Sequence, residues 1–213
     1  MDLADVAAVL FDMDGTLVSS DAAVERAWRA WAGEYGVEAG DALSVSHGRP
    51  AEETVRELRP DLDDDAATIS AARQLSFQYE DLEDVAAVEG ADGLVDLLDS
   101  YGLPWAVVTS ADKRLALARL RAARIRAPRV LVTSEDIGRG KPDPEGYLIA
   151  AARLGVTALK CLVVEDSLPG AQAGKAAGAT VATLKGVPGD LEVPNLAVLT
   201  ELLARALTSR AGS

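Results

Sequence analysis

Two aspartates, Asp12 and Asp14, end a short apolar run and are followed directly by Gly15 and Thr16. Carboxylates spaced in this way can supply a nucleophile and a proton donor, and they can also bind a cation. The alternative is an ordinary turn, in which one aspartate accepts backbone hydrogen bonds and the other is solvated, because Asp-Gly is a common turn pair. This segment alone does not separate the two interpretations, so other residues must decide.

Two further segments could contribute to the same site. Thr109 and Ser110 follow a second apolar run and offer hydroxyl and N–H groups, although such residues also commonly end strands or cap helices. Lys141 lies on a loop between glycines and prolines, and the alternative is an exposed, solubilising lysine. We favour a counter-ion, because the prolines stiffen the loop beside it. Asp143 is expected to cap the next helix, with Pro144 in the first helical position.

Glu165 and Asp166 end a further apolar run. Gathered with Asp12 and Asp14, they would repel one another strongly unless a cation lay among them. Oxygen ligands without histidine or cysteine favour magnesium over zinc. The four carboxylates therefore predict a Mg²⁺ site if the fold brings them together.

The elements that must position these residues are short apolar runs rich in Val, Leu and Ala, as in strands buried on both faces. Helical patterns lie between the later runs, at residues 93–101, 113–123, 144–154 and 169–177. This alternation predicts an α/β fold with a Rossmann-like, doubly wound parallel sheet. In such a sheet, ligands bind beyond the carboxyl ends of the strands, where Asp12, Thr109 and Asp166 fall. The predicted strands are residues 6–11, 104–109, 130–133, 161–165 and 180–184.

Residues 19–85 interrupt this alternation with helical patterns and no convincing strand. We predict a helical cap domain at residues 19–85, inserted into a catalytic core formed by residues 1–18 and 86–213. Asp21 is expected to cap its first helix. An aromatic stripe follows at helical spacing and should pack helices together rather than cage a ligand. The stripe consists of Val24, Trp28, Trp31 and Tyr35, and further helices are predicted at residues 51–58 and 65–82.

The composition limits the classes of partner. A formal net charge of −13 argues against a nucleic acid or an anionic membrane, because either needs a concentrated basic face. No apolar run is long enough to span a bilayer, and the N-terminus does not fit a signal peptide, so we expect a cytoplasmic protein. A monomer is compatible with the sequence. The single cysteine, Cys161, excludes an intramolecular disulfide and is expected to be buried.

The order of these motifs resembles a known family. Asp-x-Asp-Gly-Thr, a strand-end Thr, Gly-Lys-Pro-Asp-Pro and Val-Glu-Asp-Ser-x-x-Gly are similar to the motifs of the haloacid dehalogenase superfamily, in its phosphatase branch with a small helical cap. The resemblance covers nearly the whole chain. Residues 23–28 and 46–50 look like the sugar-phosphate, hexitol-phosphate and glycerol-phosphate phosphatases of that branch.

The resemblance implies catalytic roles. Asp12 would be the nucleophile that forms an aspartyl-phosphate. Asp14 would protonate the leaving oxygen and then activate water, and Lys141 would neutralise charge on the nucleophile and the phosphate. Thr109 and the N–H of Ser110 would hold phosphoryl oxygens.

The resemblance also implies a Mg²⁺ site formed by Asp12, the backbone carbonyl of Asp14, and Asp166, with Glu165 in support. On the cap, Arg49 is expected to bind the non-reacting end of the substrate, with His47 beside it. The alternatives are a surface arginine and a structural or solvated histidine.

The predicted function is a magnesium-dependent phosphatase acting on a small phosphorylated metabolite, a sugar or polyol phosphate monoester. A phosphosugar mutase of the beta-phosphoglucomutase type is one alternative, and a non-catalytic binding protein with the same fold is another. Hydrolysis is favoured over isomerisation of a phosphosugar because the related mutases often have valine at the position of Thr16 and use a cap histidine and a cap lysine. The corresponding helix here has Val24, and no lysine occurs before Lys113.

Overall fold

The computed structural model describes residues 3–46 and 49–211. Within them, six strands form one parallel sheet in the order β5-β4-β1-β6-β7-β8, which confirms the predicted α/β class. The predicted strands are all present, some of them shorter than expected. The strands are β1 (Ala8–Phe11), β4 (Trp105–Val108), β5 (Val130–Val132), β6 (Cys161–Glu165), β7 (Thr180–Thr183) and β8 (Leu191–Glu192).

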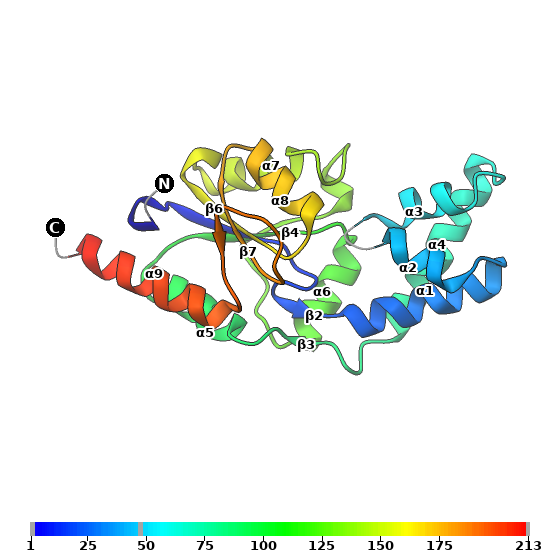
Figure 1. Ribbon diagram of the computed structural model, residues 1–213, viewed down its shortest axis with the longest axis horizontal. Coiled ribbons are helices and arrows are strands. Elements are labelled where there is room, and N and C mark those ends of the chain that lie inside the picture. Colours follow the sequence, from blue (N-terminus) through cyan, green and yellow to red (C-terminus); the bar gives the residue numbers. More distant parts are fainter. Residues whose placement is uncertain (1–2, 47–48, 212–213) are drawn as a thin grey trace.

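Helices cover both faces of this sheet (Figure 1). Val9 and Phe11 of β1 point into a cluster with α5, α6 and α9, whereas Ala8 and Leu10 point into a cluster with α7 and α8. Alternate residues of one strand thus bury against opposite helix layers, as the two-residue period of a strand requires. The bounds of these helices are α5 (Ala91–Ser100), α6 (Lys113–Ala122), α7 (Glu145–Leu154), α8 (Leu168–Ala176) and α9 (Leu196–Ala211).

Four further helices, here called the cap helices, pack together beside the sheet (Figure 1). They share a hydrophobic cluster centred on Trp31, whose Nε1 donates to Ser70 Oγ at 2.9 Å. Trp28 packs edge-on against Trp31, and Tyr35 stacks on it. The aromatic stripe therefore packs helices, although Trp28 also lines the cavity described below. The cap helices are α1 (Asp21–Tyr35), α2 (Ala39–Ser46), α3 (Ala51–Leu58) and α4 (Asp64–Glu80).

A short antiparallel ladder joins the two ends of the cap segment. β2 (Val18–Ser19) pairs with β3 (Ala86–Ala87), so the chain leaves and re-enters the core side by side. This ladder was not predicted from the sequence. It lies at the predicted boundaries between the core and the cap segment, but the domain boundaries stay a prediction.

Two of the predicted helix caps are wrong by one position. Ser20, not Asp21, is the N-cap of α1, and its side chain makes no cap hydrogen bond because its hydroxyl binds Asp14 instead. Pro144 is the N-cap of α7, which begins at Glu145. Asp143 still satisfies an end group of that helix, since its Oδ1 accepts the Glu145 N–H at 3.0 Å.

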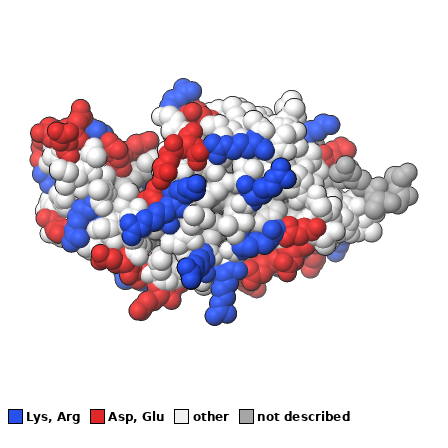
Figure 2. Space-filling view, turned by 180° about the vertical axis from the view of Figure 1, so that it is seen from behind, with Lys and Arg blue, Asp and Glu red and all other residues white. Residues whose placement is uncertain are grey.

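The surface charge is uneven. Figure 2 shows acidic side chains gathered at the end formed by the cap helices, with Lys and Arg side chains over the middle of the same face. Among the described residues, no helix is both long and apolar enough to cross a membrane. Cys161 is buried as predicted, and burial raises the pKa of its thiol to about 11.

Candidate active site

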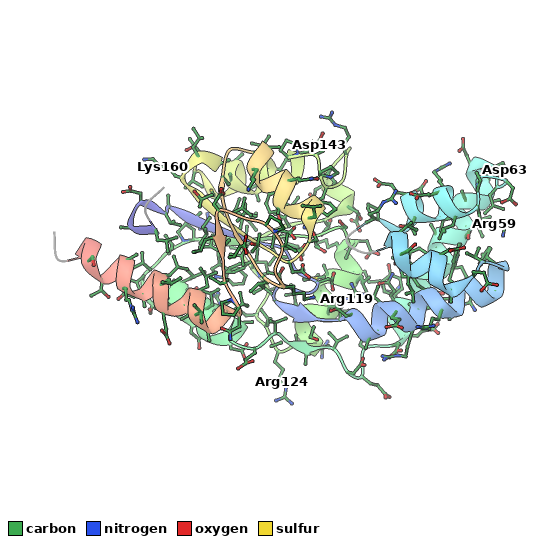
Figure 3. All side chains as sticks on the ribbon, viewed as in Figure 1. Arg59, Asp63, Arg119, Arg124, Asp143 and Lys160 are labelled. Atoms are coloured by element: carbon green, nitrogen blue, oxygen red, sulfur yellow. The ribbon has the colours of Figure 1, made fainter. Side chains whose placement is uncertain are left out.

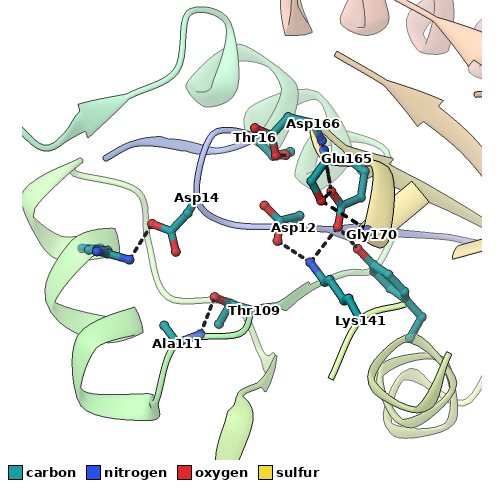
Figure 4. A network of polar contacts seen from close by, with 12 residues as sticks. Asp12, Asp14, Thr16, Thr109, Ala111, Lys141, Glu165, Asp166 and Gly170 are labelled. Carbon is teal, nitrogen blue, oxygen red and sulfur yellow. Dashed lines mark hydrogen bonds and ion pairs between the residues drawn. The ribbon is translucent and has the colours of Figure 1, made fainter. Parts of the chain in front are cut away.

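The three neighbouring strands β4, β1 and β6 bring the predicted residues to one edge of the sheet. Asp12 follows β1, Thr109 follows β4, and Asp166 follows β6; all three side chains are buried or nearly so. Asp12 N donates to Val164 O, and Thr109 N donates to Val132 O, so the sheet hydrogen bonding continues to the site. Figure 4 shows the resulting cluster.

A tight turn after β1 requires glycine at position 15. Gly15 has φ +84°, and a Cβ there would lie 2.0 Å from Asp166 Oδ2. Only glycine meets both the backbone conformation and the close approach without strain. The turn places Thr16 so that its Oγ1 donates to Asp166 Oδ1 at 3.2 Å. The sequence motif Asp14-Gly15-Thr16 therefore has a structural reason as well as a chemical one.

Lys141 joins Asp12 to Glu165. Its Nζ donates to Asp12 Oδ1 and, at 2.6 Å, to Glu165 Oε1 (Figure 4). Tyr147 OH donates to the same Glu165 oxygen at 2.8 Å. The other oxygen, Oε2, accepts from the backbone N–H of Asp166 and from the N–H and hydroxyl of Ser167. Glu165 is thus fully enclosed by donors and serves as an anchor for Lys141.

Burial and charge act in opposite directions on these groups. Burial raises the pKa of Asp12 well above its usual range, Lys141 opposes this, and the nearby carboxylates Glu165 and Asp166 add to it. Burial also raises the pKa of Glu165, but Lys141 and the donors around it outweigh burial and leave that pKa lowered. The pKa of Lys141 is raised because Asp12 and Glu165 together outweigh its burial. The lysine is therefore charged, and further positive charge beside Asp12 would lower the pKa of that carboxyl group again.

The carboxylates provide a site at which that charge could bind. Oxygens of Asp12, Glu165 and Asp166 lie within 4.8 Å of one another, and all three residues are buried. Glu165 is saturated by donors, so Asp12 and Asp166, each of which already faces one lysine, are the carboxylates that could also hold a cation. The donor set consists of hard oxygens, which suits a divalent cation such as Mg²⁺ or Ca²⁺.

Asp14 is held away from this cluster by two other groups. Ser20 Oγ donates to Asp14 Oδ1 at 2.6 Å, and Arg119 Nη1 lies 2.9 Å from the same oxygen. Arg119 comes from α6 and is buried. Neither Ser20 nor Arg119 was singled out from the sequence. For Arg119 a signal existed: it falls one turn after Leu115, on the buried face of α6.

A cavity of about 410 Å³ opens between this edge of the sheet and the cap helices. Its core side includes Asp12, Asp14 and Thr109, together with Ser110. The Thr109 hydroxyl accepts the Ala111 N–H at 3.1 Å. Apolar residues of the cap face them, and these are Val24, Trp28, Leu43, Ala51 and Leu75.

Arg49 also lines the cavity, but it is already paired with carboxylates of α3. Its Nη1 donates to Glu57 Oε2 at 2.5 Å, and its Nε lies 3.9 Å from Glu53. His47, the other predicted cap residue, lies outside the described residues.

Several residues that build the site were not foreseen. Tyr147 reaches Glu165 from α7, and Lys185 Nζ lies 2.9 Å from Asp166 Oδ2. Gly170 is required because a Cβ there would lie 1.6 Å from Glu165 Oε1. Gly170 does belong to the Val-Glu-Asp-Ser-x-x-Gly motif, so its spacing was visible even though its contact was not.

Comparison with known proteins identifies the family and agrees with this fold. The model of the haloacid dehalogenase-like hydrolase family matches residues 6–178, and the chain belongs to that family. Hexitol phosphatase A of Escherichia coli is 40% identical over 172 residues, covering 81% of this chain and 80% of that protein. The 2-deoxyglucose-6-phosphate phosphatase 1 of Saccharomyces cerevisiae is 37% identical over 189 residues, covering 80% and 76%. Within the family, the enzyme class is phosphoric monoester hydrolase.

Solved structures agree on the fold. A hydrolase from Pseudomonas syringae superimposes with a TM-score of 0.76 at 25% identity, covering 94% of this chain and 90% of that chain. A beta-phosphoglucomutase from Clostridium difficile superimposes with a TM-score of 0.86, covering 98% and 100%. Its identity is 16%, so the likeness concerns the fold alone.

Proposed function

We propose that the chain is a magnesium-dependent phosphatase that hydrolyses the phosphate monoester of a small sugar or polyol through an aspartyl-phosphate on Asp12. The observation that carries this proposal is the bridge from Lys141 to both Asp12 and Glu165 beside Asp166. A carboxylate attacks a phosphate ester only where the negative charges of both are offset, and this cluster is arranged to offset them.

The first step transfers the phosphoryl group to the enzyme. An oxygen of Asp12 forms a bond to phosphorus while the bond from phosphorus to the ester oxygen breaks, and Asp14 gives its proton to the departing alkoxide. In the second step, water attacks phosphorus and Asp14 takes a proton from that water. The bond from phosphorus to the Asp12 oxygen breaks, which gives inorganic phosphate and the free Asp12 carboxylate. A positioned acid is worth about 10² to 10⁴ in rate for a leaving group as basic as a sugar alkoxide.

Other residues of the site hold the substrate and the metal. Thr109 and the N–H of Ser110 would bind phosphoryl oxygens at the end of β4. Asp12, the carbonyl of Asp14, and Asp166 would hold Mg²⁺, with Glu165 positioning Lys141 beside them. When bound, Mg²⁺ would neutralise the phosphate and favour the ionised form of Asp12.

The charges around the cavity support a monophosphate with an uncharged remainder. Among the described lining residues, the cations are Arg49 and Arg119, and both are paired with carboxylates. Because these carboxylates offset the charge of both arginines, the lining favours no second anionic group, which a bisphosphate-dependent mutase must bind, whereas other N–H groups of Arg49 can still donate to a substrate hydroxyl. The relatives named above act on phosphates of a hexitol and of 2-deoxyglucose, and a further relative from yeast is named a glycerol-1-phosphate phosphohydrolase.

A phosphate-release screen tests this function. Sugar, polyol, nucleotide and glycolate phosphates are incubated with Mg²⁺ and either the unchanged protein or Asp12→Asn. We expect release from sugar or polyol phosphates and none with Asp12→Asn; activity that survives the substitution would exclude Asp12 as nucleophile. Beta-glucose 1-phosphate with a bisphosphate activator tests the mutase: glucose 6-phosphate without free phosphate would contradict hydrolysis.

Arg49→Ala tests the cap contact, with Arg56→Ala as the matched control, because Arg56 lies on α3 and is paired with Glu52 and Asp64 outside the cavity lining. We expect Arg49→Ala to raise KM for a polyol phosphate about 10-fold, the value of one lost polar contact. A short alkyl phosphate without hydroxyls should be unaffected. Unchanged kinetics on every ester would rule out a substrate contact for Arg49.

A further inference from the structure

Arg119 connects Asp14 to a cap helix. It lies on α6, at the junction of the core and the cap helices (Figure 3), and its side chain is 4% exposed. Nη1 lies 2.9 Å from Asp14 Oδ1, and Nη2 donates to Gln78 Oε1 at 2.5 Å. Gln78 belongs to α4, and its own amide continues to Gln74 Oε1 at 2.6 Å. One guanidinium therefore binds a candidate catalytic carboxylate and a cap side chain at the same time.

The arrangement leaves part of Arg119 unsatisfied. Its Nε is buried and has no hydrogen-bond partner among the described residues. An unpaired buried donor is unfavourable for stability, and a buried ion pair is not by itself a strong stabilising device. A contribution to stability alone therefore explains this arginine poorly. A role in orienting Asp14 explains why Nη1 contacts Asp14 while Nη2 donates to Gln78.

The contacts of Asp14 are one-sided. Ser20 Oγ and Arg119 both bind Oδ1, and in the described part of the chain no side chain binds Oδ2. Asp14 lines the cavity together with Arg119 and Gln78. Fixing one oxygen of a carboxylate restricts its rotation and presents the other oxygen to a ligand in the cavity.

We propose that Arg119 is a positioning residue, which holds Oδ1 of Asp14 so that Oδ2 meets the leaving oxygen of the substrate. Because Gln78 of α4 binds the same guanidinium, the orientation of Arg119 depends on the position of α4. Asp14 is therefore aligned only when the cap helices lie against the core. The proposal rests on the role of Asp14 in the proposed function. Arg119 itself does not touch the reacting atoms.

The test separates alignment of an acid from general damage by changing the leaving group. An alkyl phosphate needs a proton on its leaving oxygen, whereas p-nitrophenyl phosphate releases a stable phenolate without one. The parameter kcat/KM reports the first phosphoryl transfer only, so later hydrolysis of the aspartyl-phosphate does not affect it. Loss of folded protein would lower kcat/KM equally for both substrates.

Arg119→Met should lower kcat/KM for a sugar phosphate about 10- to 100-fold, the usual effect of losing an orienting contact. For p-nitrophenyl phosphate the change should stay within about 3-fold, because no acid assists that leaving group. Gln78→Leu should also lower kcat/KM for the sugar phosphate more than for p-nitrophenyl phosphate, and this split between the two substrates should be smaller than in Arg119→Met. Arg121→Met, an exposed change on the same helix, should leave both values unchanged.

Equal losses on the two substrates, or no loss on the sugar phosphate, would overturn the proposal. If Arg119→Met does not fold, Arg119→Lys gives the same comparison, since it keeps the charge but lacks the planar fork whose separate nitrogens reach Asp14 and Gln78. Asp14→Asn distinguishes the two levels of inference. If it shows no split between the substrates, the acid role in the proposed function fails. If Asp14→Asn shows the split and Arg119→Met does not, only the positioning role fails.

Discussion

Lys141 Nζ lies 2.6 Å from Glu165 Oε1 and also donates to Asp12. Glu165, which is fully buried, therefore fixes the position of the Lys141 ammonium group beside Asp12. Glu165 does not line the cavity described above, because Tyr147 and Ser167 enclose it. The alignment of the candidate nucleophile therefore depends on a carboxylate that lies outside that cavity.

Glu165→Gln removes the negative charge that holds Lys141. We expect kcat for a sugar phosphate to fall about 10- to 100-fold, because an orienting partner is lost while Asp12 and Lys141 remain. Steady-state kinetics measure the change. Glu201→Gln, in an exposed pair on α9, is the control and should behave as the unchanged protein. An unaffected kcat in Glu165→Gln would show that Lys141 does not need this anchor.

Gly170→Ala brings a methyl group into Glu165. The added Cβ would lie 1.6 Å from Oε1, so the helix start or the carboxylate must move, and we expect a loss of about 1–3 kcal/mol in the free energy of unfolding together with lost activity. Gly93→Ala is a matched control in α5, where a Cβ meets nothing within 4 Å. It should stabilise by about 0.5–1 kcal/mol. Urea unfolding gives both values, and similar stabilities would contradict the close packing.

Metal removal should abolish hydrolysis. A chelator is expected to stop phosphate release, and added Mg²⁺ to restore it, because the three buried carboxylates of Asp12, Glu165 and Asp166 outnumber the two lysines that face them. Asp166→Asn should raise the Mg²⁺ concentration for half-maximal activity by at least about 10-fold. Titration of Mg²⁺ against phosphate release measures it. Full activity in the chelator would refute metal dependence.

Asp136 offers a pH-dependent test of the core outside the site. Arg153 and then the backbone N–H of Thr133 hydrogen-bond its carboxylate and lower its pKa. A lowered folded-state pKa gives stability that is present above the unfolded value, about 3.9, and is lost as pH falls through the folded value.

Asp136→Asn should therefore be less stable at neutral pH by about 1 kcal/mol, the usual worth of a capping contact, and the difference should shrink below about pH 4. Urea unfolding at several pH values follows it, with Asp96→Asn, an exposed change on α5, as the control. A difference that stays constant into acid would mean that the carboxylate charge contributes nothing.

The sequence predicted the sheet and the residues at its edge for a simple reason. In a parallel sheet the strand ends are fixed by topology, so polar residues after β1, β4 and β6 must lie together. The proximity of Asp12, Thr109 and Asp166 could therefore be predicted without any knowledge of side-chain contacts. The α9 helix also carried a readable pattern, with Leu196, Leu199, Leu203 and Leu207 on its buried face, and went unassigned all the same.

Contacts between distant segments were not predictable in the same way. Arg119 meets Gln78 and Asp14 only because α6 and α4 pack together, and Tyr147 meets Glu165 only because α7 packs on the sheet against β1 and β4. Local propensity does not encode such pairings. Ser20 is a related case. It is the N-cap of α1, but its hydroxyl donates to Asp14 and not to its own helix, which capping preferences do not predict.

The most direct test of the proposed function is to detect phosphate on Asp12. The protein is mixed with substrate and Mg²⁺, quenched in acid within one turnover, and digested for mass spectrometry. We expect one phosphoryl group on the peptide that contains Asp12, sensitive to hydroxylamine and absent in Asp12→Asn. Phosphate release with no phosphorylated peptide, in a protein whose Asp12→Asn variant still turns over, would contradict the account.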